Sequence, residues 1–207
     1  MLDASLPGAP LAALGLPAGL PLATALLSTG VVTVAEIGDK TQLLALLLAA
    51  RYRRPVPIVA GILVATLLNH ALAGWLGALV ADWLTAAVLR WGMVASFLAI
   101  ALWSLVPDRI EDDAMPRAGN AFAATAMAFF LAEIGDKTQV ATVLLAAKYA
   151  PLWEVVAGTT LGMLVANVPV LLLGARFAQR LPLRAARIAA ALVFAALAGG
   201  VALRSIG

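Results

Sequence analysis

The chain has 207 residues, of which 63% are hydrophobic and only 12% are charged. Soluble domains carry about a quarter charged residues, so this composition excludes an ordinary soluble protein and favours one embedded in a membrane. The chain has no cysteine, which excludes a disulfide framework and a thiolate metal site. The net charge of +3 comes from basic residues in short segments between apolar stretches, a pattern that membrane topology explains better than a nucleic-acid partner.

The N-terminal segment, residues 1–21, contains Asp3, several prolines and no Lys or Arg. A secretory signal peptide begins with positive charge, so this segment is predicted to be a short, uncleaved and poorly ordered lead-in rather than a signal.

Six apolar segments follow the lead-in, and a membrane-spanning helix needs about 20 mostly apolar residues. Four of these segments contain few or no charged residues. The other two, 22–50 and 121–147, each contain a charged heptapeptide near the middle. The sequence therefore predicts an all-α membrane protein with six transmembrane helices. In chain order the predicted spans are 22–50, 55–81, 91–107, 121–147, 155–175 and 186–203.

A strongly charged segment, 108–120, separates two halves of three spans each, 22–107 and 121–207. A charge cluster of this kind is typical of a solvated loop, and a role in recruiting metal or in regulation is the alternative. The charges are those of Asp108, Arg109, Glu111, Asp112, Asp113 and Arg117.

The two halves are related in sequence. The heptapeptide Glu-Ile-Gly-Asp-Lys-Thr-Gln occurs at 36–42 and again at 133–139, an offset of 97 residues. At the same offset Gly61 matches Gly158, and polar His70 matches polar Asn167. A match of this extent indicates a duplication.

The basic residues between the spans are distributed unequally, with nine on one predicted side and three on the other. The positive-inside rule places the nine in the cytoplasm, so both termini are predicted to face away from it. Three spans per half then give an inverted-topology repeat, which in secondary transporters places the site near the midplane between the halves. The nine are Arg51, Arg53, Arg54, Arg109, Arg117, Arg176, Arg180, Arg184 and Arg187; the three are Arg90, Lys148 and Arg204.

If the first heptapeptide is helical, Glu36, Asp39 and Lys40 lie three and four residues apart and share one face. Gly38 would weaken the helix there and allow close approach of another backbone. The second heptapeptide predicts the same arrangement. Ionisable residues within spans are usually functional, and two copies at equivalent depth favour a site over simple salt bridges between spans.

Two Glu, two Asp and two Lys sum to −2 when all are ionised. One divalent cation or two protons would neutralise this charge, so cation binding and proton release are coupled. Oxygen ligands without cysteine, and with a single histidine in the chain, suit hard cations such as Ca²⁺, Mn²⁺ or Mg²⁺ better than zinc or copper.

Two E-x-G-D-[KR]-[TS] motifs in a six-span chain of this size resemble the small cation/proton antiporters. This family includes bacterial Mn²⁺ exporters and eukaryotic Ca²⁺/Mn²⁺ transporters of the Golgi and chloroplasts. The resemblance implies that Glu36 and Glu133 exchange protons and that Lys40 and Lys137 are charge partners. The ligands that it implies are Glu36, Asp39, Thr41, Glu133, Asp136 and Thr138, and the match extends to Gln42 and Gln139, whose amide oxygens are further candidate ligands.

Three further polar residues lie in the predicted spans. His70, the only histidine, could carry protons or contact the cation, but the simpler interpretation is an interior histidine hydrogen-bonded to Asn69. Asn167 is interpreted in the same way, as a polar contact between helices. All three are candidates for positions next to the ligands.

The predicted function is export of a divalent cation, Mn²⁺ first and Ca²⁺ second, across the bacterial inner membrane in exchange for protons, with no cofactor and no enzymatic activity. A cation channel is the alternative, and it needs no proton coupling. An intramembrane enzyme is disfavoured because no serine in the spans has an adjacent base. A structural scaffold is disfavoured by the duplicated charges. The oligomeric state stays open.

Overall fold

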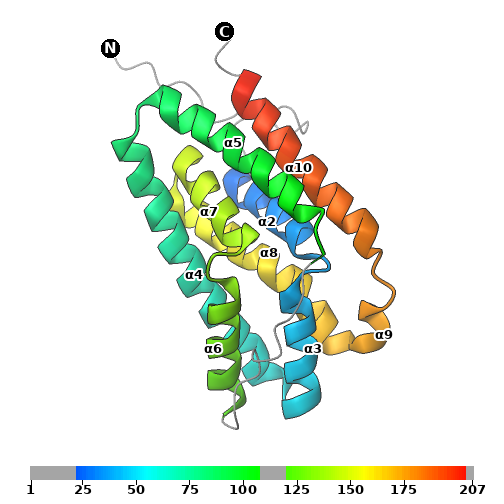
Figure 1. Cartoon of the computed structure of the whole chain (residues 1–207). Helices are drawn as coiled ribbons and strands as arrows, with labels where there is room; N and C mark the ends of the chain where they lie inside the picture. Colours follow the sequence, from blue (N-terminus) through cyan, green and yellow to red (C-terminus); the bar gives the residue numbers. More distant parts are fainter. Residues whose placement is uncertain (1–21, 108–119, 204–207) are drawn as a thin grey trace.

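The structure is a computed structural model that describes residues 22–107 and 120–203, and these residues form helices joined by short connections (Figure 1). The predicted lead-in and nearly all of the charged linker lie outside the described residues. The helices are α2 (Ala23–Glu36), α3 (Lys40–Tyr52), α4 (Pro55–Trp83), α5 (Ala86–Ser104), α6 (Ala121–Glu133), α7 (Lys137–Lys148), α8 (Leu152–Leu173), α9 (Ala175–Ala178) and α10 (Leu183–Leu203).

Four helices, α4, α5, α8 and α10, are long and apolar enough to cross a membrane. They coincide with four of the predicted spans, and the all-helical membrane class is confirmed. Their outer faces carry large exposed apolar side chains, for example Leu72, Trp75 and Leu76 on α4. Apolar side chains exposed in this way suit contact with lipid chains.

The two segments that carry the heptapeptides are each divided into two short helices, α2–α3 and α6–α7. At about 1.5 Å per residue, the 14 residues of α2 reach about 21 Å, short of the ~30 Å hydrocarbon core of a bilayer. Because the chain leaves the helix between Glu36 and Lys40, the prediction that Glu36, Asp39 and Lys40 share one helical face is wrong.

Each divided segment packs against the long helix of the other half: α2 lies along α8, and α6 lies along α4. Glycines permit this approach. A Cβ added to Gly158 would lie 2.3 Å from the carbonyl oxygen of Ala25, and one added to Gly61 would lie 2.8 Å from that of Phe122. These two contacts are equivalent at the 97-residue offset, so each half packs against the other in the same way.

The helices α5 and α10 lie side by side (Figure 1). Their contact is centred on Phe97 and Phe194, whose stacked rings have centroids 6.3 Å apart and which are also related by the 97-residue offset. Figure 1 further shows that the chain runs in opposite directions along α2–α3 and along α6–α7. The two breaks are thereby brought together in the middle of the molecule.

Candidate cation site

The first break is a tight turn formed by Glu36, Ile37, Gly38 and Asp39. Ile37 has φ −65° and ψ 114°, Gly38 has φ 85°, and the Asp39 amide donates to the Glu36 carbonyl over 3.0 Å. These are the features of a type II turn, whose third position has positive φ and therefore favours glycine. The sequence Glu-Ile-Gly-Asp thus ends one helix and begins the next.

The second break repeats this geometry. Ile134 has φ −62° and ψ 120°, Gly135 has φ 75°, and the Asp136 amide donates to the Glu133 carbonyl over 3.1 Å. Each turn therefore places a glutamate at the end of one helix and an aspartate at the start of the next.

The glutamine that ends each heptapeptide supports its turn. The side-chain oxygen of Gln42 accepts from the Gly38 amide over 2.9 Å, and that of Gln139 accepts from the Gly135 amide over 2.7 Å. Gln42 also donates through Nε2 to the Ala166 carbonyl of α8 over 2.9 Å. Both amide oxygens, expected as ligands, are thus already engaged by the turns. The bond to Ala166 could not be predicted from the sequence, because its acceptor is a backbone carbonyl that every residue has.

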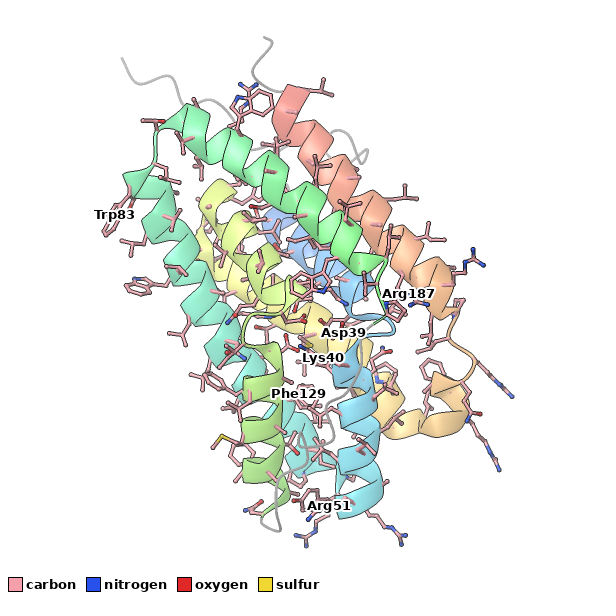
Figure 2. All side chains as sticks on the ribbon, viewed as in Figure 1. Asp39, Lys40, Arg51, Trp83, Phe129 and Arg187 are labelled. Atoms are coloured by element: carbon pink, nitrogen blue, oxygen red, sulfur yellow. The ribbon has the colours of Figure 1, made fainter. Side chains whose placement is uncertain are left out.

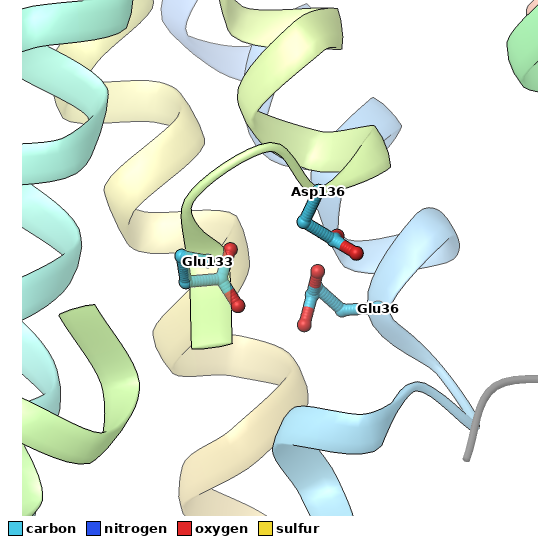
Figure 3. Close-up of side chains that lie close together, drawn as sticks. All are labelled: Glu36, Glu133 and Asp136. Carbon is cyan, nitrogen blue, oxygen red and sulfur yellow. The ribbon is translucent and has the colours of Figure 1, made fainter. Parts of the chain in front are cut away.

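Three carboxylates from the two halves converge at the breaks (Figure 3). One carboxylate oxygen from each of Glu36, Glu133 and Asp136 lies within 4.8 Å of the others, and all three residues are buried. Asp39 is also buried, but its carboxylate is outside this group and bonds to Lys137.

Both glutamates are oriented by a threonine five residues later. The Thr41 hydroxyl donates to Glu36 Oε2 over 2.6 Å, and the Thr138 hydroxyl donates to Glu133 Oε2 over 3.0 Å. The second oxygen, Oε1, of each glutamate has no hydrogen-bond partner among the described residues. Buried polar atoms are rarely left without partners, so these two oxygens are available to a bound ion or proton.

The lysines pair across the halves. Lys40 Nζ lies 3.1 Å from Asp136 Oδ1, and Lys137 forms the equivalent ion pair with Asp39. The two pairs differ in exposure: 28% of the Lys40 side chain is accessible but only 4% of that of Lys137. Figure 2 shows Asp39 and Lys40 about midway along the molecule, far from Arg51 at one end and Trp83 towards the other.

The polar residues of the long helices lie beside the breaks. Asn69 donates through Nδ2 to the Phe130 carbonyl over 3.0 Å, one turn before Glu133, and His70 follows on the buried face of α4. Neither ring nitrogen of His70 has a partner among the described residues, so the expected bond to Asn69 is wrong. Asn167 donates to the Met163 carbonyl of its own helix over 3.0 Å, not to another helix.

With all groups ionised, the four acids and two lysines leave a charge of −2 on a buried cluster of oxygen ligands. Carboxylate and hydroxyl oxygens are the ligands that hard divalent cations prefer. The fold and the cluster therefore define a multi-pass membrane protein with a buried acidic cluster, a candidate ion site, where its two halves meet.

Comparison with known proteins identifies the class. The chain belongs to the family described as "Divalent cation/proton antiporter GDT1", which it matches in two stretches, residues 24–112 and 121–206. It is 56% identical over 158 residues to a Vibrio cholerae protein named "Putative manganese exporter", covering 76% of this chain and 79% of that protein. It is 29% identical over 171 residues to the "GDT1-like protein sll0615" of Synechocystis, covering 70% and 80% respectively. No solved structure matches. The predicted family is confirmed, and the protein is a transporter rather than an enzyme.

Proposed function

We propose that the protein exports a divalent cation from the cell in exchange for protons, with Mn²⁺ as the first substrate and Ca²⁺ as the second. The single observation that carries this proposal is the buried group of Glu36, Glu133 and Asp136. The family and the relative named as a manganese exporter support the choice of cation.

The charge of the cluster supports exchange over simple binding. A net charge of −2 within a membrane is costly, and either one divalent cation or two protons would remove it. Because a cation needs deprotonated carboxylates, its binding expels protons, and protonation expels the cation. The two unpartnered oxygens, Glu36 Oε1 and Glu133 Oε1, are the atoms that we assign to this exchange.

The other residues of the heptapeptides take supporting roles in this proposal. Asp39 and Asp136 complete the negative charge of the site, and Lys40 and Lys137 offset part of it. Thr41 and Thr138 hold the glutamates and can add hydroxyl oxygens to a bound cation. Gln42 and Gln139 keep the turns in place, and their oxygens have a second lone pair for a ligand.

We assign His70, Asn69 and Asn167, on the buried faces of α4 and α8, to positions next to the site. Asn69 holds the end of α6 beside Glu133, and His70 presents two unpartnered nitrogens on the same buried face. We assign His70 the role of holding water or the cation next to Glu133, because a buried imidazole without partners costs stability and gains from a bound molecule.

The architecture that we propose for the membrane has six crossings, in which α2–α3 and α6–α7 are interrupted spans. Discontinuous helices at the midplane are typical of transporters built from inverted repeats, because an irregular backbone is tolerated where it lines an ion site. The arginine-rich end then faces the cytoplasm, both termini face away from it, and the membrane is the inner membrane. Alternating access would come from one half moving against the other.

The decisive experiment uses purified protein in proteoliposomes with a pH gradient, and it records Mn²⁺ movement and internal pH together. The E36Q and E133Q variants should each lose Mn²⁺ transport and proton counterflow. E154Q is the matched control, because Glu154 lies at the start of α8, outside the cluster. Wild-type exchange in E36Q and E133Q would reject the proposed site. Mn²⁺ movement without proton counterflow in the unaltered protein would instead identify a channel.

A further inference from the structure

A cavity lies where α3 meets α4, at the end of the molecule that carries Arg51 and away from Asp39 and Lys40 (Figure 2). It has a volume of about 220 Å³, and its wall combines two arginines with apolar side chains. Arg53 and Arg54 come from the corner between α3 and α4, and Leu171 and Leu172 come from the last turn of α8. Ala49, Pro55 and Ile58 complete the apolar part. The cavity thus lies between a corner of the first half and a helix end of the second.

The charge of the cavity is positive. Arg53 and Arg54 line it, and no acidic residue does so among the described residues. The helix ends leave about half a negative charge, because the ends of α3 and α8 each contribute about half a negative charge and the start of α4 about half a positive one, and the two arginines outweigh it. Arg53 and Arg54 form no ion pair with any described residue. The arginines therefore set the sign, and the cavity favours an anion.

The arginine pair is a specific addition to the first half. At the 97-residue offset, Arg53 and Arg54 correspond to Ala150 and Pro151. Arg53 also ends α3 with φ 52°, a conformation that normally favours glycine. An arginine at this position, where glycine would fit the backbone better, is consistent with use of its side chain.

An exposed apolar stripe leads from the cavity along α8. Leu161, Val165 and Leu172 are spaced by four and seven residues, so they share one face, and each is about half exposed or more. Leu172 belongs both to this stripe and to the cavity wall. The site therefore offers two cations for a phosphate and, directly beside them, an apolar track of the kind that an acyl chain covers in a bilayer.

We propose that this cavity binds the phosphate headgroup of an anionic phospholipid, with an acyl chain lying along α8. Arginine suits this role because its planar guanidinium donates two parallel hydrogen bonds to a phosphate. Basic cavities between helices on the cytoplasmic side of a membrane are suited to such headgroups, and this is the side that we propose faces the cytoplasm. A bound lipid would contact the α3–α4 corner of one half and α8 of the other at once.

The test measures lipid retained by the full-length protein, purified from nanodiscs that contain equal amounts of phosphatidylglycerol and phosphatidylcholine, by native mass spectrometry. The unaltered protein should retain phosphatidylglycerol in preference. The R53Q/R54Q variant should show a preference about thirtyfold weaker, as expected for two removed cations that each contribute about 1 kcal/mol near a membrane surface. Inorganic phosphate added in millimolar excess should not displace the lipid, whereas displacement would identify a site for free phosphate and overturn the lipid assignment.

Two further variants separate the cavity from general surface charge. R51Q/R176Q removes two exposed arginines from the same end that do not line the cavity, and it should retain lipid as the unaltered protein does. L172W keeps all charges and narrows the cavity mouth at an exposed position, so it should lose retention without loss of folding. The proposal would be overturned if R51Q/R176Q lost as much bound phosphatidylglycerol as R53Q/R54Q does. It would also be overturned if L172W retained as much of this lipid as the unaltered protein.

Discussion

Lys40 of the first heptapeptide forms its ion pair with Asp136 of the second, with 3.1 Å between Nζ and Oδ1. The adjacent residue of its own heptapeptide, Asp39, pairs instead with Lys137. Each half therefore neutralises an aspartate of the other. The two ion pairs join the halves at the level where the glutamates meet.

The two lysines should differ in their effect on stability. Removing one partner of a buried ion pair costs about 3–5 kcal/mol because a buried charge is left uncompensated. Both variants leave a buried aspartate, but 28% of the Lys40 side chain is accessible and only 4% of that of Lys137, so water can replace the Lys40 ammonium beside Asp136 more readily than the Lys137 ammonium beside Asp39. K137M should therefore lower the melting temperature in detergent more than K40M. Equal shifts for the two variants would contradict the asymmetry.

The glycines of the two turns are predicted to be required, but to different degrees. A non-glycine residue in the left-handed region costs about 1–2 kcal/mol. An added Cβ at Gly135 meets nothing within 4 Å, whereas one at Gly38 would lie 3.0 Å from Leu183 Cδ2. G38A should therefore lower the melting temperature and transport more than G135A. G30A, in open space on α2, is the control and should be harmless.

The contact between α2 and α8 should not tolerate a methyl group at Gly158. Its added Cβ would lie 2.3 Å from the Ala25 carbonyl oxygen, a backbone atom that cannot move without shifting the helix. We expect G158A to cost about 1–3 kcal/mol of stability, measured by thermal unfolding. G199A, on α10 with no atom near its added Cβ, should be unaffected. An unchanged melting temperature in G158A would contradict this packing.

The threonine hydroxyls that orient the glutamates should contribute to cation affinity. A hydrogen bond to a charged group is worth about 1.5–3 kcal/mol, so T41V and T138V should each raise the KM for Mn²⁺ by roughly tenfold or more. T41S and T138S keep the hydroxyl and should stay near the KM of the unaltered protein. If the serine variants raise the KM for Mn²⁺ as much as the valine variants do, the hydroxyl bonds to Glu36 and Glu133 are not the cause of the weaker affinity.

A variant of His70 can show whether this residue serves transport or only packing. Because neither nitrogen has a partner among the described residues, replacing the ring with an apolar side chain removes a cost of burial. H70L should therefore keep or raise the melting temperature while transport falls. A lower melting temperature with unchanged transport in the surviving protein would assign His70 to packing alone.

Much of the fold followed from the linear pattern. The apolar stretches at 55–81 and 155–175 were recognisable because a span must be about 20 residues long and nearly free of charge. They correspond to α4 and α8, which begin and end within a few residues of the predicted limits. The division at Gly38 was harder to predict, because glycine inside a helix can be tolerated as well as break it.

The residues of the candidate site stay a prediction, whereas several of the contacts expected among them were wrong. The helical spacing of Glu36 and Lys40 suggested a shared face, and this failed because a type II turn intervenes. The hydrogen bond expected between His70 and Asn69 failed because Asn69 bonds to the Phe130 carbonyl, on a helix whose position no local pattern specifies.

The sequence by itself determined that this is a helical membrane protein with a duplicated charged heptapeptide, because composition, apolar length and repetition are properties of the linear chain. Only the tertiary structure decided that Lys40 meets Asp136 and that Glu36, Glu133 and Asp136 form one group. The physical reason is that identical heptapeptides allow either lysine to pair with either aspartate. The packing of α2 on α8 and of α6 on α4 selects the pairing across the halves.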